Sequence, residues 1–217
     1  MARSVVLRPS TRCPGCRMPP RWCICTGYRP VHVPLRIDVL MDHVEQWRPS
    51  STGNLINRLI PDAGRHPFRR GVLLDGAAVR QADRELWILH PRGDPMPATV
   101  APSRVQVLLL DGAWREAAVM LRKLDGWGRT VNLAMTGESR YWLRTQAADG
   151  RFSTVEALIF LLGAFALERE QAELRLQFEL HVYAGLLARG KRNEADHYLV
   201  DSPVRAAFPE LVARLRG

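Results

Sequence analysis

The sequence predicts an α/β domain with a mainly parallel β-sheet, preceded by a small cysteine-rich segment. Strand-like runs alternate with helical patterns along most of the chain, and the strongest of these runs are almost continuously apolar. Strands of that composition are covered on both faces, as they are in parallel sheets. The cysteine-rich segment is predicted because all four cysteines of the 217-residue chain lie within its first 25 residues.

The predicted strands are short and end in turn-forming residues. The strongest is the run Val-Gln-Val-Leu-Leu-Leu, which ends at Leu110. A proline-rich stretch over residues 92–103 predicts a surface loop. The five predicted strands are Leu35–Met41, Gly71–Asp75, Leu86–His90, Val105–Leu110 and Arg129–Ala134.

Helices are expected between these strands and over the C-terminal third of the chain. Pro61 ends the first helix, and Ser153-Thr-Val-Glu156 has the capping-box pattern that opens a long apolar helix. The expected helices are Thr52–Ile60, Trp114–Leu124, a helix from the capping box to about Glu168, Gln171–Arg189 and Val204–Leu215.

The amino-acid composition narrows the class of protein to which this chain can belong. The chain is 47% apolar and 24% charged, a globular balance that excludes wholesale disorder. The longest uncharged apolar run, Ala157–Leu167, has eleven residues, whereas a membrane span needs about 20. We therefore expect no membrane association. Because the first residues do not resemble a secretory signal, we expect a cytoplasmic chain.

The net charge of +9 makes a polyanion such as RNA or DNA a leading candidate partner. Arginines make up 29 of the 31 basic residues, and only Lys123 and Lys191 are lysines. Such a skew can come from a GC-rich genome. Codon bias exchanges arginine for lysine, however, and does not by itself create the excess of positive charge.

The four cysteines fall within thirteen consecutive residues, and the 192 residues that follow contain none. A disulfide framework normally spreads its cysteines through the fold, so this cluster favours a tetrahedral zinc site. Four sulfur ligands leave no position for water, and the metal would fold the segment without catalysing. A redox dithiol or an incidental cluster is the alternative. The candidate ligands are Cys13, Cys16, Cys23 and Cys25.

We accordingly expect a zinc-binding segment over residues 1–29 and the main domain over residues 30–217. Arginines and aromatic residues alternate in the segment, a pattern that suits contacts to phosphates and bases. These residues are Arg12, Arg17, Arg21, Trp22, Tyr28 and Arg29.

Asp111 is the leading candidate for a catalytic residue. It directly follows the strongest strand, and in open α/β sheets ligands bind beyond the carboxyl ends of the strands. A carboxylate there is placed to accept a proton, and Gly112 lets the backbone approach a ligand closely. The alternative is that Asp111 only caps the helix that follows.

Two further clusters offer polar groups after a predicted strand or before a predicted helix. Ser51, Thr52 and Gly53 present hydroxyl and backbone N–H groups to an anion, although they could simply cap a helix. Arg144 suits a carboxylate or phosphate, and Glu156 is either functional or only the capping-box acid. The sequence has no Walker A or Gly-x-Gly-x-x-Gly motif, which disfavours ATP hydrolysis and Rossmann-type nicotinamide chemistry.

Four blocks in a fixed order resemble the DTW-domain family, which includes bacterial tRNA-uridine aminocarboxypropyltransferases. The resemblance covers roughly residues 13–160 and departs from the family at Ala113, where the family has threonine, and at Ser51, where it often has asparagine. The blocks are Cys13-x2-Cys16-x6-Cys23-x-Cys25, Glu45-x2-Arg48-Pro-Ser-x-Thr52-Gly53, Leu110-Asp-Gly-Ala-Trp114 and Ser139-x-Tyr141-x-Leu-Arg144 with Thr154-x-Glu156.

The resemblance implies a SPOUT-like fold with a C-terminal trefoil knot that binds S-adenosylmethionine. It further implies transfer of the 3-amino-3-carboxypropyl group to N3 of a tRNA uridine, with release of methylthioadenosine and with Asp111 as general base. We expect a monomer and no protein partner. The implied cofactor-binding residues are Thr52, Gly53, Pro91, Leu110, Gly112, Trp114, Tyr141, Arg144, Ser153, Thr154 and Glu156.

Two alternatives stay open at this stage. A SPOUT-like RNA methyltransferase would have the same fold and would release S-adenosylhomocysteine. A non-catalytic, zinc-containing RNA-binding protein would account for the charge and the cysteines, and the missing threonine at Ala113 favours it.

Overall fold

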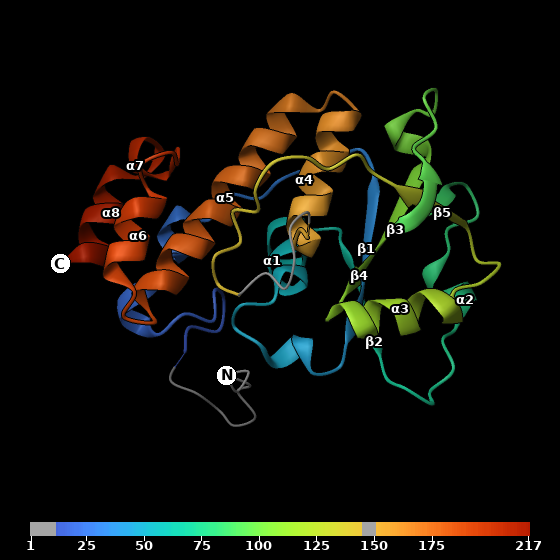
Figure 1. The fold of residues 1–217 in the computed structure, drawn as a ribbon, viewed down its shortest axis with the longest axis horizontal. Helices are drawn as coiled ribbons and strands as arrows, with labels where there is room; N and C mark the ends of the chain where they lie inside the picture. Colours follow the sequence, from blue (N-terminus) through green and yellow to red (C-terminus); the bar gives the residue numbers. More distant parts are fainter. Residues whose placement is uncertain (1–11, 145–150) are drawn as a thin grey trace.

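A computed structural model describes residues 12–144 and 151–217 of the chain. Its centre is a five-stranded sheet in the order β2-β1-β4-β3-β5, in which all neighbouring strands are parallel (Figure 1). The predicted α/β architecture with a parallel sheet is confirmed. The strands are β1 Arg36–Asp42, β2 Gly64–Phe68, β3 Glu85–Pro95, β4 Val105–Asp111 and β5 Arg129–Asn132.

Helices cover both faces of the sheet. One core cluster joins α1, α4 and α5 to strand residues such as Val39 and Val107, while α2 and α3 pack on Leu40 and Leu108. Alternate residues of β1 and β4 therefore enter opposite clusters, which is why these strands are apolar throughout. The α-helices are α1 Thr52–Leu59, α2 Gly76–Val79, α3 Trp114–Lys123, α4 Thr154–Ala164, α5 Glu168–Leu187, α6 Arg192–Tyr198, α7 Val204–Ala207 and α8 Pro209–Arg216.

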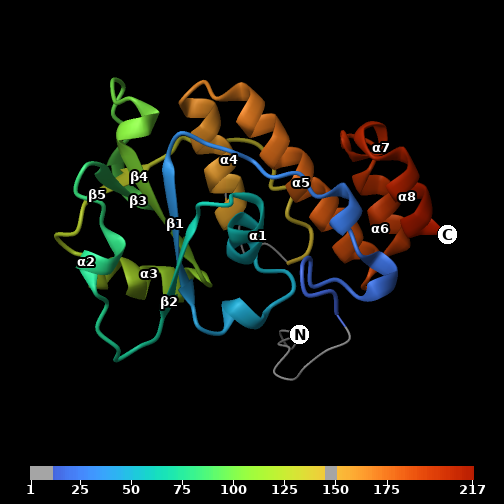
Figure 2. The same cartoon turned by 180° about the vertical axis from the view of Figure 1, so that it is seen from behind.

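The cysteine-bearing segment packs against the C-terminal helices at one end of the molecule (Figures 1 and 2). A Cβ atom on Gly27 would lie 2.7 Å from Leu211 and 3.0 Å from Leu180, so this backbone touches α5 and α8 directly. Gln177 donates to the Gly27 carbonyl at 2.9 Å, and Arg214 donates to the Cys23 carbonyl at 2.6 Å. The segment thus shares the larger core cluster with the rest of the chain, and a domain division at residue 29 stays a prediction.

One predicted strand is wrong. Residues 71–75 are irregular, and Leu73 is 96% exposed. The strand in this region is β2, whose sequence Gly-Arg-His-Pro-Phe is too polar to suggest one. Because β2 lies at the edge of the sheet, the missing N–H of Pro67 is tolerated there.

Several element boundaries also differ from the prediction. Strand β3 continues past Pro91 to Pro95, where it pairs with β5 after an irregularity in register, so part of the expected loop is strand. The capping-box helix ends at Ala164, and α6 was not predicted. The expected C-terminal helix is divided into α7 and α8, because Pro209 opens a new helix. None of the helices in the described ranges is long and apolar enough to cross a membrane.

Asp38 organises a buried polar network between three strands. His66 contacts it at 2.8 Å, Gln106 donates to it at 2.8 Å, and Arg36 forms an ion pair with it at 3.0 Å. Burial alone would raise the pKa of Asp38, but the hydrogen bonds from His66, Arg36 and Gln106 outweigh it and lower the pKa. A Cβ on Gly64 would lie 1.7 Å from the carboxylate, so only glycine fits the neighbouring position on β2.

Replacing Asp38 with asparagine is expected to lower the free energy of unfolding by about 2 kcal/mol at neutral pH, because several hydrogen bonds to a charge are weakened. The lowered pKa means that the carboxylate stabilises the fold above its unfolded value of about 3.9 and loses this effect as pH falls through the folded value. Urea denaturation should therefore show the difference between wild type and D38N narrowing in acid. D201N, at an exposed position, is the control and should behave as wild type.

Candidate active site and cysteine cluster

Asp111 ends β4 at the carboxyl edge of the sheet, opposite Met41 of β1. Its side chain is buried, and each carboxylate oxygen accepts a hydrogen bond from a hydroxyl group. Ser51 donates to Oδ2 at 2.9 Å, and Thr154 donates to Oδ1 at 2.7 Å. A Cβ on Gly53 would lie 2.6 Å from Oδ2, so glycine is required for this approach. One carboxylate thus ties the starts of α1 and α4 to the end of β4.

Burial raises the pKa of Asp111, and the nearby negative charge of Glu45 raises it further. The hydroxyl of Thr154, the positive charge of Arg144 and the hydroxyl of Ser51 act in the opposite direction without reversing the shift. A carboxylate with a raised pKa binds a proton more readily than an exposed aspartate does. This environment suits a group that takes up a proton during a reaction.

Arg144 forms a two-pronged ion pair with Glu45, with Nη2 at 2.6 Å from Oε2 and Nη1 at 3.3 Å from Oε1. Arg48 contacts the same carboxylate. Tyr141, which is buried, donates to the carbonyl of Ser50. Arg144 and Tyr141 thus hold the segment that leads into α1, so Arg144 is already engaged by a protein carboxylate.

A pocket that is partly open to solvent lies beside Asp111 at the carboxyl ends of β3, β4 and β5. Its lining is mainly apolar, and Thr154 links it to the carboxylate of Asp111. Six of the predicted cofactor residues line it: Pro91, Leu110, Gly112, Trp114, Ser153 and Thr154. Five others lie outside its lining: Thr52, Gly53, Tyr141, Arg144 and Glu156.

Glu156 is engaged by the backbone around it. Ser153 N donates to it at 2.7 Å, which confirms the predicted capping box of α4. Ser139 Oγ lies 2.9 Å from both of its oxygens, and Arg140 N donates at 2.7 Å. Glu156 therefore anchors the strand-to-helix connection at residues 139–140 to the start of α4.

The alternative role of Asp111 as a helix cap is wrong. The N-cap of α3 is Ala113, whose side chain has no oxygen to accept from the first turn. The carboxylate of Asp111 instead bonds to Ser51 and Thr154, which belong to other helices.

His90 is a pocket residue that the sequence analysis did not single out. Its Nδ1 accepts the backbone N–H of Arg92 at 3.1 Å, which leaves the proton of the neutral ring on Nε2. Burial lowers the pKa of His90, and the charge of Arg92 lowers it further. His90 ends its apolar run as Asp111 ends its own, so the same positional argument identifies it.

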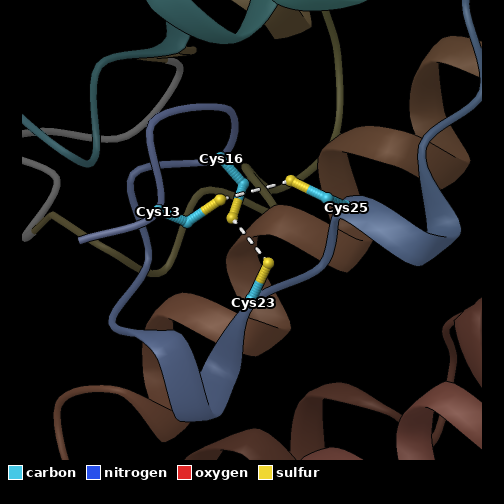
Figure 3. Close-up of side chains that lie close together, drawn as sticks. All are labelled: Cys13, Cys16, Cys23 and Cys25. Atoms are coloured by element: carbon cyan, nitrogen blue, oxygen red, sulfur yellow. Dashed lines mark hydrogen bonds between the residues drawn. The ribbon is translucent and has the colours of Figure 1, made fainter. Parts of the chain in front are cut away.

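The four cysteines converge from two loops, with their sulfur atoms pointing toward one another (Figure 3). All four sulfur atoms lie within 4.8 Å of one another. Cys13 Sγ lies 3.5 Å from Cys25 Sγ, and Cys16 Sγ lies 3.7 Å from Cys23 Sγ, distances too long for disulfide bonds. A hydrogen bond from the backbone of Cys16 lowers the pKa of Cys13 to about 6, which favours a thiolate.

The site and the cysteine cluster both fall within a single family match. The family model for the DTW domain matches residues 10–185, which is most of the chain. The chain belongs to the DTW-domain family. Membership is consistent with a role in tRNA modification. None of the solved structures matches the chain.

In this DTW domain, the sequence blocks that resemble the family meet at one edge of the sheet. Ser51 and Glu45 come from the second block, Asp111 from the third and Thr154 from the fourth. The first block reaches the same edge through Arg17, whose guanidinium donates to the carbonyl of Gln46. Blocks that are far apart in sequence therefore form one structural unit.

Replacing Ala113 with threonine is expected to stabilise this DTW domain by about 1 kcal/mol. The new hydroxyl would occupy the N-cap of α3 and accept an N–H of the first turn, which alanine cannot do. Thermal denaturation checks this, with Ala113→Val as the control of nearly equal shape. If A113T and A113V gave the same melting temperature, the cap would not be the cause.

Proposed function

We propose that this protein transfers the 3-amino-3-carboxypropyl group of S-adenosylmethionine to N3 of a uridine in tRNA. The observation that carries the proposal is the apolar pocket beside a buried carboxylate, because residues of the blocks that resemble the family contribute to both. The proposal includes the SPOUT-like trefoil knot that the resemblance implies, and it treats residues 30–217 as the catalytic domain.

In this proposal the pocket holds S-adenosylmethionine, and its apolar walls at Leu110 and Trp114 suit the adenine ring. The bound molecule supplies a sulfonium group, whose γ-carbon is the electrophile and whose leaving group is methylthioadenosine. Ser153 and Thr154 stand at the start of α4, where the positive end of the helix dipole attracts a carboxylate. We assign the amino-acid end to this position, because Arg144 is engaged by Glu45.

N3 of uracil carries a proton and is a poor nucleophile until that proton is removed. Thr154 lines the pocket and donates its hydroxyl hydrogen to Asp111 at 2.7 Å, whereas Asp111 itself lies behind the wall. We propose that Thr154 takes the N3 proton as it passes its own to Asp111. Ser51 keeps the other carboxylate oxygen in place. A positioned base of this kind contributes roughly 10²–10⁴-fold to the rate.

The cysteine cluster fits a structural zinc ion. Zinc–sulfur bonds of about 2.3 Å in a tetrahedron separate the sulfur atoms by about 3.8 Å. The two sulfur pairs at 3.5 and 3.7 Å match that spacing. Cys13, Cys16, Cys23 and Cys25 would fill all four positions, so the ion would stabilise the segment.

Asp111→Asn is expected to slow formation of modified uridine by at least ~10²-fold, because the amide retains the shape and cannot accept the proton. Single-turnover assays of tRNA, read by mass spectrometry of nucleosides, measure this effect. Because burial and Glu45 raise the pKa of Asp111, the wild-type rate should fall with acidification at a pH above the usual aspartate range. Calorimetric binding of S-adenosylmethionine should change little in the variant.

Thr154 offers a matched pair of variants for the same step. Thr154→Val keeps the shape and removes the hydroxyl, so its rate should fall as that of D111N does, whereas Thr154→Ser should retain most of it. Near wild-type turnover in D111N would remove Asp111 from the mechanism. Release of S-adenosylhomocysteine in place of methylthioadenosine would identify a methyltransferase and overturn the proposed reaction.

Elemental analysis of freshly purified, reduced protein is expected to give one zinc per chain. Replacing Cys23 with serine should release the metal and loosen the N-terminal segment, and it should weaken binding of tRNA. Proteolysis within residues 12–29 and tRNA affinity measure the two effects. Protein without zinc, but with normal stability and tRNA binding, would show that the cluster is not a metal site.

A further inference from the structure

We propose that the surface around the turn Glu45–Trp47 binds single-stranded RNA, with Arg17, Arg65 and Arg189 on phosphates and Trp47 stacked on an unpaired base. The inference deepens the proposed function, since it locates the RNA and requires the target uridine to be unpaired. It stands on three observations: a group of arginines drawn from distant segments, their lack of acidic partners, and an exposed tryptophan among them.

The first arginines come from the cysteine segment and from β2. Arg17 follows Cys16 with a φ of 60°, and its guanidinium donates to the carbonyl of Gln46, next to Trp47. Arg65 is exposed on the edge strand β2. Arg65 Nη2 lies 3.9 Å from Met41 Sδ near the end of β1, the strand that leads into the turn contacted by Arg17.

The third arginine, Arg189, lies just after the end of α5. Arg189 is exposed and donates to the carbonyl of Leu143, beside Arg144. Arg144 in turn pairs with Glu45 at 2.6 Å, and Glu45 precedes the Gln46 carbonyl that Arg17 contacts. Arg12 donates to the carbonyl of Arg17 at 3.2 Å, and these contacts join both groups into one positive surface.

The nearby acids do not neutralise this surface. Within residues 12–144 and 151–217, Arg17, Arg65 and Arg189 form no ion pair with a carboxylate. Glu45 is buried and already shared by Arg48 and Arg144, and Asp42 lies 3.8 Å from His43 Nδ1 and pairs with none of these three arginines in the described residues. Arg17, Arg65 and Arg189 together therefore form a phosphate-binding arrangement.

Trp47 supplies an aromatic face within this surface. Its side chain is 48% exposed, although a large aromatic residue is usually buried. The turn below it is held firmly: Trp47 N donates to Val44 at 3.2 Å, and Gln46 O accepts from Arg17 and from Asn54 at 3.1 Å. Bases of single-stranded RNA stack on aromatic side chains held beside arginines.

The reaction chemistry agrees with a single-stranded ligand. N3–H of uridine is the group that pairs with adenine, so a paired uridine cannot react at N3. Enzymes that modify such atoms act on unpaired or extruded bases. Trp47 stands two residues from Glu45, whose charge acts on Asp111, so a base stacked there would lie close to the candidate site.

Charge reversal at the two exposed arginines tests the surface. Binding of a tRNA transcript is measured over a range of salt for R65E, R189E and the control R104E, which makes the same change in net charge. Arg104 is exposed at the start of β4, about 20 Å from Asp111 along the strand. We expect R65E and R189E to bind about tenfold or more weakly with a shallower salt dependence, and R104E to bind within about twofold of wild type.

Trp47→Ala should weaken binding of an oligouridine of about ten nucleotides by roughly tenfold, and Trp47→Phe should restore most of it. Equal losses in R65E, R189E and R104E, or normal binding in all, would overturn the inferred surface. The same would follow if W47A bound oligouridine as wild type does. If the variants lost binding as expected, but wild type gave no aminocarboxypropyl product, the proposed function would fail while the RNA surface stood. If wild type gave the aminocarboxypropyl product but all the variants bound RNA normally, the proposed function would stand and the RNA surface would fail.

Discussion

The buried carboxylate of Asp111 is the contact on which the candidate site depends. A parallel sheet brings the carboxyl ends of its strands to one edge, but it does not fix the loops there. Ser51 and Thr154 hydroxyls on the two carboxylate oxygens fix the starts of α1 and α4 against β4. Gly53 allows the close approach, because a side chain there would overlap Asp111. The same contact therefore shapes the site and joins the helices that cover one face of the sheet.

Two acidic residues at this edge of the sheet, Asp111 and Glu45, have different direct partners. Glu45 is paired with the guanidinium groups of Arg48 and Arg144. Asp111 has only neutral hydroxyl donors as direct partners in the described residues, and burial raises its pKa. Asp111 therefore binds a proton more readily than an exposed aspartate does, which suits a group that exchanges a proton.

The sequence predicted the parts of the fold that rest on continuous apolar runs or on a local motif. Strand β4 and the capping box of α4 are of this kind, since Val105–Leu110 and Ser153–Glu156 carry their own signals. Strand β2 was missed because its pairing with β1 comes from the tertiary fold and not from its composition. The partner of Arg144 was missed because Glu45 lies 99 residues away, and no local pattern connects them. Asp111 could be located from its strand, whereas its hydroxyl partners could not.

The contact between Arg17 and Gln46 connects the cysteine segment to the candidate site. Residue 17 adopts positive φ directly after Cys16, a conformation that the turn around the sulfur cluster imposes. The guanidinium is thereby directed onto the carbonyl of Gln46, between Glu45 and Trp47. Any ion held by the four sulfur atoms would fix that turn and, through it, the side chains beside Asp111. The cysteine segment thus carries one arginine to the rim of the candidate site.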